Sequence, residues 1–189
     1  MTSKSHVTRR GADGGCSGIL VRMSTTDQQV RLRALTESDV PRVLALNEAE
    51  VQMLAPMDEL RLRLLHDIAH QFAVIDVGGA FGGFVVTFAP GAGYDSENYR
   101  WFTERYGDGF LYLDRVVVDP SVRRRGVAGA VYDLVEAVAS SYGLLALEVN
   151  LVPRNDPSLA FHAARGFVEV GRLGDEAHLV SLQTKSLGR

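Results

Sequence analysis

The chain has 189 residues, of which 46% are hydrophobic and 23% are charged, and its formal net charge is −3. This length supports one domain with a sizeable core, and the slight acidity argues against a general nucleic-acid-binding protein, which usually carries a basic excess. The single cysteine, Cys16, excludes an internal disulfide, and no segment is apolar for long enough to cross a membrane, so we expect a cytoplasmic protein without a membrane partner.

The first 28 residues are expected to form a disordered leader, because residues 11–18 are small and polar and show no periodicity. Met23 is a second plausible start of the chain. We therefore expect a folded domain over residues 29–185 and a short tail over residues 186–189.

The first half of the domain shows a strand, two helices and a hairpin. Residues 30–34 alternate as a strand does, and residues 36–39 have the composition of a helix start. A first helix carries the apolar stripe Val40, Val43, Leu44 and Val51. A second helix over residues 58–70 is expected to bury Leu60, Leu64, Leu65 and Ile68. Residues 72–77 and 81–88 flank Gly78 and Gly79, which predicts an antiparallel hairpin.

The second half begins with a long aromatic loop over residues 89–109, in which a short helix is possible. Residues 110–118 are apolar on both faces, as in a central strand. A helical stripe over residues 127–138, a strand over 144–152 and a helix beginning near Asn155 follow. Residues 167–170 and 178–183 complete the pattern as strands. This order predicts an α/β fold with both antiparallel and parallel strand pairs.

The junction between the strand at 110–118 and the next helix is unusual. Arg123, Arg124 and Arg125 stand at a helix N-terminus, which the macrodipole already makes positive. Gly126 has no Cβ, and Ala128 and Gly129 are small, so an anion could approach the backbone closely. Three arginines beside such a site indicate a polyphosphate. Neither a Walker A sequence nor the dinucleotide-binding glycine pattern occurs here.

Two motifs carry a family resemblance. The sequence Arg123-x-x-Gly126-x-Ala128 resembles the phosphate-binding motif of the GNAT superfamily of acyl-CoA N-acyltransferases. Downstream, residues 155–167 resemble the same family's Asn-x-x-Ala-x-x-x-Tyr-x-x-x-Gly-Phe element. The resemblance covers about residues 30–184, and residues 94–102, Asp114-Arg115 and Phe161-His162 are similar to a bacterial group of predicted, largely uncharacterised acetyltransferases.

The resemblance implies a fold and a co-substrate. The fold is a single GNAT-like domain with a mixed, mostly antiparallel sheet flanked by helices on both faces. The co-substrate is acetyl-CoA, with no metal, and its pantetheine lies along the strand at 110–118. The residues implied for the coenzyme are Val116, Val117, Val118, Arg123, Arg124, Arg125, Gly126, Val127, Ala128, Gly129, Asn155 and Ser158. Asn155 could also simply cap the helix that follows it, and both roles can hold at once.

Catalysis requires deprotonation of an amine, a donor for the oxyanion and stabilisation of the leaving thiolate. His162 stands where many family members carry tyrosine, so it is a candidate for general acid or base, with simple packing as the alternative. Glu148 is the candidate base, and a hydrogen-bonded brace to Arg115 or the 89–109 loop is the alternative. Asp114 is a weaker candidate, for which an ion pair is the alternative. The oxyanion donor is expected to be a backbone N–H near Val116.

The acceptor pocket is expected to draw on the aromatic loop. The candidates are Tyr94, Asn98, Tyr99 and Trp101, together with Asn150, which shares a strand face with Glu148. Asp95 and Glu97 would attract a cationic amine, and Asn47 and Glu48 could face the same pocket. In the alternative interpretation the aromatic side chains only pack the loop onto the core.

Three functions are compatible with these motifs. The leading hypothesis is an N-acetyltransferase that transfers an acetyl group from acetyl-CoA to a primary amine of a small molecule by direct attack on the thioester. A non-catalytic acyl-CoA-binding or sensor domain is the second, and a protein lysine or N-terminal acetyltransferase is the third. The preferred acyl chain is open, no nucleic-acid partner is expected, and a homodimer is possible.

Overall fold

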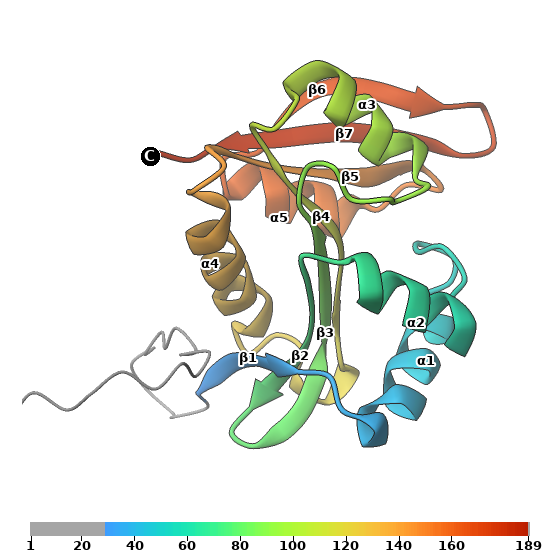
Figure 1. Ribbon diagram of the computed structural model, residues 1–189, viewed down its shortest axis with the longest axis vertical. Coiled ribbons are helices and arrows are strands. Elements are labelled where there is room, and N and C mark those ends of the chain that lie inside the picture. Colours follow the sequence, from blue (N-terminus) through green and yellow to red (C-terminus); the bar gives the residue numbers. More distant parts are fainter. Residues whose placement is uncertain (1–28, 189) are drawn as a thin grey trace, which may run out of the picture.

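The computed structural model describes residues 29–188, and Figure 1 shows its helices and strands. The predicted leader over residues 1–28, with Cys16 and Met23, lies outside the described residues. Two short 3₁₀ turns, Glu37–Asp39 and Pro120–Val122, accompany the regular elements. In chain order these are β1 (Val30–Ala34), α1 (Val40–Ala49), α2 (Glu59–Ile68), β2 (Gln71–Val77), β3 (Ala80–Phe88), α3 (Glu97–Tyr106), β4 (Leu111–Val118), α4 (Val127–Ala139), β5 (Leu144–Val152), α5 (Asp156–Ala164), β6 (Val168–Gly174) and β7 (Leu179–Ser186).

The strands form one seven-stranded sheet in the order β1-β2-β3-β4-β5-β7-β6. Strands β4 and β5 pair in parallel, and all other neighbours in this sheet pair antiparallel. Helices α1, α2 and α3 contribute side chains to the core on one face, and α4 and α5 to the core on the other (Figure 1). The predicted mixed, mostly antiparallel sheet with helices on both faces is therefore confirmed.

The parallel pair at the centre of the sheet opens after only two residue pairs. Leu111 lies opposite Leu145 and Tyr112 opposite Ala146, and no further pair joins β4 to β5 within the described chain. Beyond this point the facing edges of the two strands have no strand partner. The sheet is thereby split into a gap whose walls are β4 and β5, and this gap positions the site described below.

A β-bulge in β4 changes which side chains face the gap. Val86 pairs with Arg115 but Thr87 pairs with Leu113, which leaves Asp114 as the extra residue. Tyr112 and Val117 both pack in the core beneath α1, α2 and α3, although they are five positions apart and a regular strand would place them on opposite faces. Strict alternation would place Asp114 and Arg115 on opposite faces, whereas the bulge lets their side chains meet on one face.

Local sequence signals account for the ends of several elements. Gly78 and Gly79 adopt φ of 62° and 89°, the conformation that a two-residue turn needs between β2 and β3. Asp58, Ser96 and Asn155 each accept a backbone N–H with the side chain and so cap α2, α3 and α5. The predicted loop over residues 89–109 thus contains a full helix of ten residues, α3.

The buried face of α2 differs from the prediction. Leu60 and Leu64 are 80% and 48% exposed, against the prediction, whereas Leu65 is fully buried as predicted and Leu62 is fully buried as well. The helix carries two apolar stripes, and the one through Leu62 and Leu65 continues to Ile68 and Ala69, which pack on the same core. The longer stripe is the buried one. At the other end of the chain, Ser186 pairs with Leu144, so β7 reaches into the expected tail.

Candidate functional site

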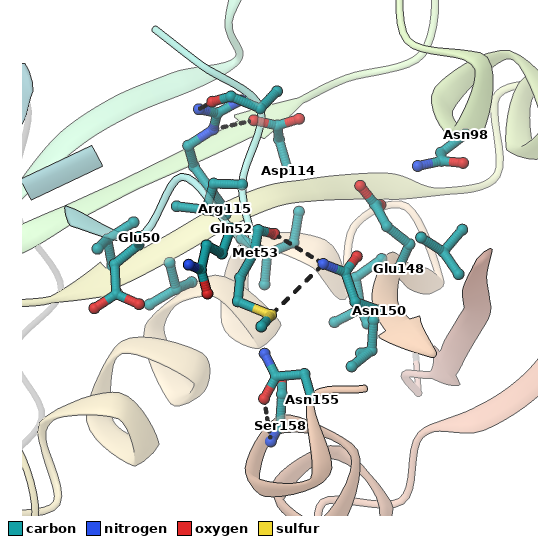
Figure 2. Close-up of a pocket in the computed structure, with 18 of the residues that line it drawn as sticks. Glu50, Gln52, Met53, Asn98, Asp114, Arg115, Glu148, Asn150, Asn155 and Ser158 are labelled. Carbon is teal, nitrogen blue, oxygen red and sulfur yellow. Dashed lines mark hydrogen bonds and ion pairs between the residues drawn. The ribbon is translucent and has the colours of Figure 1, made fainter. Parts of the chain in front are cut away.

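A cleft of about 910 Å³ occupies the gap between β4 and β5. Its walls come from segments that are distant in the sequence: the loop between α1 and α2, residues 94–98, the second half of β4, the start of α4, the middle of β5 and the first turns of α5. Figure 2 shows Asp114, Arg115, Glu148 and Asn150 along one side, with Asn155 and Ser158 from α5 below them. The cleft therefore joins the two motifs that the sequence singled out.

The end of the cleft at the start of α4 suits an anion. Gly126 adopts φ of 79°, and no atom lies within 4 Å of the position that its Cβ would take. Arg124 also adopts a left-handed φ, of 59°, so the turn before the helix alternates in conformation. The first N–H groups of a helix have no intrahelical acceptor. Together with the helix dipole, this backbone offers a concave, electropositive corner.

Arg123 is already engaged at this corner. Its Nε donates to the carbonyl oxygen of Val118 at 2.9 Å, and its guanidinium donates to Glu50 at 2.5 Å. Both side chains of the ion pair are partly exposed, at 43% for Arg123 and 31% for Glu50. The contact ties the loop after α1 to the anion corner, and an incoming anion would compete with Glu50 for Arg123.

The free edge of β4 leads away from this corner. The N–H of Asp119 donates to Gly82 of β3, so by alternation the N–H groups of Val116 and Val118 point toward the gap. Val116, Val117 and Val118 all line the cleft. An extended ligand could pair with this edge as an added strand would. Asn155 and Ser158 face the same ligand path, and the Asn155 side chain accepts the N–H of Ser158 in the expected cap.

His162 lines the cleft but is neutral and fully hydrogen-bonded. Its Nδ1 lies 2.7 Å from the carbonyl oxygen of Ser158, which can only accept, so Nδ1 carries the proton. Its Nε2 therefore accepts from the Tyr132 hydroxyl at 2.6 Å. Burial lowers the pKa of His162 to about 4. At neutral pH the ring therefore carries one proton, on Nδ1, which argues against an imidazolium as general acid, and the alternative role of a neutral base stays a prediction.

Glu148 lies on the floor of the cleft and has a perturbed acidity. Its carboxylate accepts from the Tyr112 hydroxyl at 2.5 Å, and Asn98 also hydrogen-bonds to it. Burial raises the pKa of Glu148 to about 7, and the nearby charge of Asp114 adds to this rise, while the bonds from Tyr112 and Asn98 oppose it. No arginine or lysine of residues 29–188 forms an ion pair with it. The predicted brace to Arg115 is absent, but the alternative brace from the 89–109 loop is present through Asn98, and Tyr112 adds a second brace.

Asp114, in contrast, has a cationic partner in Arg115. It accepts from Arg115 at 2.6 Å and from the buried Tyr94 hydroxyl at 2.5 Å, which is the ion pair expected as the alternative to a catalytic role. Arg115 in turn donates to Asn47 of α1 at 2.8 Å. Asn47 is fully buried beneath the cleft, where it anchors Arg115 and so does not line the acceptor pocket.

The aromatic loop over residues 89–109 contributes fewer side chains to the lining of the cleft than expected. Tyr94, Asp95 and Asn98 line the cleft, and Asp95 pairs with Arg61 of α2. Tyr99 is buried outside the lining, where its hydroxyl donates to Ala89. Trp101 packs against Gly171 of β6. The expectation that Tyr99 and Trp101 line a pocket is therefore wrong, and for them the packed-loop alternative holds. Glu48 and Glu97 are exposed and lie outside the lining as well.

The sequence analysis missed several cleft residues. The loop after α1 crosses the cleft, where the carbonyl oxygen of Met53 accepts from the Asn150 side chain at 3.3 Å (Figure 2). Arg61 and Tyr132, which line the cleft, were missed as well, and so was Tyr112, a buried residue that is hydrogen-bonded to Glu148. Within residues 29–188 no group of three acidic, histidine or cysteine side chains could hold a metal ion. None of the helices in this range is long and apolar enough to span a membrane.

The comparisons with known proteins agree with this geometry. The chain matches the model of the acetyltransferase (GNAT) family over residues 41–167. A search of the curated proteins returned no significant match.

Solved structures resemble the fold at low sequence identity. Ard1 from Thermoplasma volcanium is 18% identical with a TM-score of 0.65, and the match covers 85% of this chain and 99% of that one. A protein described as a phosphinothricin N-acetyltransferase is 17% identical, with a TM-score of 0.61 and coverage of 85% and 99%. Arabidopsis thaliana Naa50, in complex with the bisubstrate analogue CoA-Ac-MVNAL, is 14% identical, with a TM-score of 0.59 and coverage of 84% and 99%.

Proposed function

The chain belongs to the acetyltransferase (GNAT) family, whose members are acetyl-CoA-dependent N-acetyltransferases, and we propose that it acetylates a primary amine of a small molecule by direct attack of the amine on the thioester. The observation that carries this proposal is Glu148, a half-buried carboxyl group close to the point where the strands part. It has an elevated pKa and no cationic partner among the described residues.

The coenzyme end of the cleft fits acetyl-CoA, which supplies the activated acetyl group when bound. The open backbone at Gly126 and the arginines before it suit a pyrophosphate, and the free edge of β4 suits the amide groups of pantetheine. Asn155 would contact the same arm. The N–H near Val116 would donate to the oxyanion that forms when the amine attacks.

The acceptor end fits an amine because of how its charges are compensated. Asp114 has Arg115, and Asp95 has Arg61, but no cationic side chain of residues 29–188 pairs with Glu148. An ammonium group would supply that cation and then give its proton to Glu148, since a carboxylate with a pKa of about 7 is poised to act as a base near neutral pH. The neutral amine that results has the lone pair needed for attack.

The size of the acceptor is inferred from the loop after α1. This loop is held across the cleft at both ends, by Glu50 on Arg123 and by Met53 on Asn150. Such a cover leaves room for a compact amine and little for a folded protein surface. The cytoplasmic location and the homodimeric state stay predictions.

The test is thiol release from acetyl-CoA over a panel of small amines, peptides with free N-termini and lysine peptides, with wild type and Glu148→Gln. We expect one or more small amines to be acetylated and Glu148→Gln to lower turnover by about 10² to 10⁴. Glu97→Gln, an exposed carboxylate outside the cleft, is the matched control and should be unchanged. Turnover with peptides alone would favour a protein acetyltransferase, and acetyl-CoA binding without any turnover would favour a sensor.

A further inference from the structure

The departing sulfur needs a hydrogen-bond donor, and His162 cannot be that donor. Its one proton, on Nδ1, is held by the Ser158 carbonyl, and its Nε2 faces the Tyr132 hydroxyl as an acceptor. The O–H of this pair belongs to Tyr132, which donates it to Nε2 of His162 and could donate it instead to an anion bound in the cleft. Like His162, Tyr132 is among the residues that line the cleft.

The placement of Tyr132 suits a contact with the sulfur end of the coenzyme. The residue lies on α4 six positions after Gly126, which is about 9 Å along the helix axis. Helix α4 follows β4 after a short turn, and Figure 1 shows it running alongside the sheet from the β1 end toward α5. A ligand anchored at Gly126 and extended along the free edge of β4 would therefore pass the side of α4 that bears Tyr132.

The ring of Tyr132 is firmly held. It packs edge-on against Phe161, His162 and Phe167, with ring centroids 5.0, 5.3 and 6.2 Å away. The side chain is only 6% exposed. Burial raises the pKa of Tyr132, so the phenol stays protonated at every pH at which the enzyme would work. Such a group is a preorganised hydrogen-bond donor rather than an acid that gives up its proton.

We propose that the Tyr132 hydroxyl is the hydrogen-bond donor to the sulfur of coenzyme A, and that His162 is a positioning residue that holds this hydroxyl until the sulfur replaces it. The proposal rests on the proposed function, because it requires coenzyme A in the cleft. When the amine nitrogen bonds to the acetyl carbon, the C–S bond breaks and its electron pair stays on sulfur. The amine's proton goes to Glu148, and the thiolate leaves with a hydrogen bond from Tyr132, to be protonated later by solvent.

One competing donor lies nearby. The Ser158 hydroxyl is 3.3 Å from Nδ1 of His162 and also lines the cleft. A phenol is the more acidic hydroxyl and hence the stronger donor to an anion. The Ser158 hydroxyl also sits beside Nδ1, whereas the Tyr132 hydroxyl sits at Nε2, the end of the ring that Ser158 does not reach.

The experiment measures the pKa of the coenzyme A thiol when bound to the full chain, from its ultraviolet thiolate absorbance, so no acceptor is needed. The variants are Tyr132→Phe, His162→Phe and Ser158→Ala. In wild type the bound thiol should titrate below its free value of about 8.5. Tyr132→Phe should raise this pKa by about one unit or more, whereas the other two variants keep most of the wild-type shift.

Calorimetric titration of coenzyme A on the same samples shows whether each variant still binds. An unchanged thiol pKa in Tyr132→Phe that binds normally overturns the proposal and leaves the proposed function intact. Loss of the whole shift in His162→Phe or Ser158→Ala, but not in Tyr132→Phe, assigns the donor elsewhere and overturns it too. A wild-type chain that does not bind coenzyme A overturns the proposed function and this inference with it.

Discussion

The two ends of the cleft are built in different ways. The coenzyme end is made of backbone from one contiguous stretch, the turn and first residues of α4 together with the free edge of β4. The acceptor end is made of side chains from distant segments, such as Asn98 and Glu148, and Tyr112 supports Glu148 from outside the lining. The first end depends on local conformation and helix electrostatics, and the second depends on tertiary packing. Each end should therefore fail separately when it is altered.

The largest effect on coenzyme binding is expected at the coenzyme end. Gly126→Asp should weaken acetyl-CoA binding by at least about 100-fold, because it places a carboxylate where the pyrophosphate would sit. Aspartate tolerates the left-handed conformation better than most residues, so the fold should survive. Isothermal calorimetry measures the change.

Gly91→Asp is the matched control for this variant. Gly91 has a similar φ of 80° and equally open surroundings, but lies outside the cleft lining. A folded Gly126→Asp that binds as well as Gly91→Asp would contradict the pyrophosphate assignment.

A smaller effect is expected at the acceptor end from Tyr112→Phe. The Tyr112 hydroxyl holds the pKa of Glu148 down, so its loss should raise that pKa above about 7. A base works only when deprotonated, so the acidic limb of the kcat/KM profile should move to higher pH. Activity should fall near pH 7 and recover at alkaline pH.

Tyr99→Phe separates this electrostatic effect from general damage to the aromatic cluster. Tyr99 is a buried tyrosine of the same cluster whose hydroxyl contacts Ala89 and no carboxylate. Tyr99→Phe should leave the acidic limb of the kcat/KM profile at its wild-type pH. A uniform loss of activity in Tyr112→Phe, with the limb unmoved, would show that Tyr112 acts only in packing.

The smallest effect is expected from the Glu50–Arg123 ion pair, which ties the loop after α1 to the coenzyme end. Glu50→Gln should tighten acetyl-CoA binding by about two- to fivefold, since it removes the carboxylate that competes for Arg123, and partly exposed pairs contribute little. The gain should shrink as salt is added. Glu48→Gln, on the exposed face of α1, is the control. Weaker binding in Glu50→Gln would mean that the loop must stay closed for the coenzyme to bind.

The same contrast explains what could be predicted from the sequence. The run of arginines before Gly126 is local, and helix-start chemistry alone predicts an anion site there, although not the left-handed conformation of Arg124. Strand periodicity also placed Glu148 and Asn150 together on the cleft side of β5. The bulge at Asp114 could not be predicted, because an extra residue in one strand leaves no pattern in a run of apolar residues.

The hydrogen-bond and packing partners of the predicted site residues could not be predicted from the sequence either. The sequence suggests that His162 is titratable near neutral pH, but its burial and its bonds to Tyr132 and Ser158 come only from packing α5 against α4. Trp101 was expected in the pocket because aromatic loops often line sites, yet it covers Gly171 of β6, a strand far along the chain. Pairwise contacts of this kind need the fold.

The central claim is that one cleft holds acetyl-CoA at one end and keeps an uncompensated carboxyl group for the amine at the other. Calorimetric titration of acetyl-CoA into wild type, Gly126→Asp and Glu148→Gln tests it most directly. The account predicts saturable and similar binding to wild type and Glu148→Gln, and binding at least about 100-fold weaker to Gly126→Asp. Absence of binding to a well-folded wild type, or equal binding to all three, would contradict it.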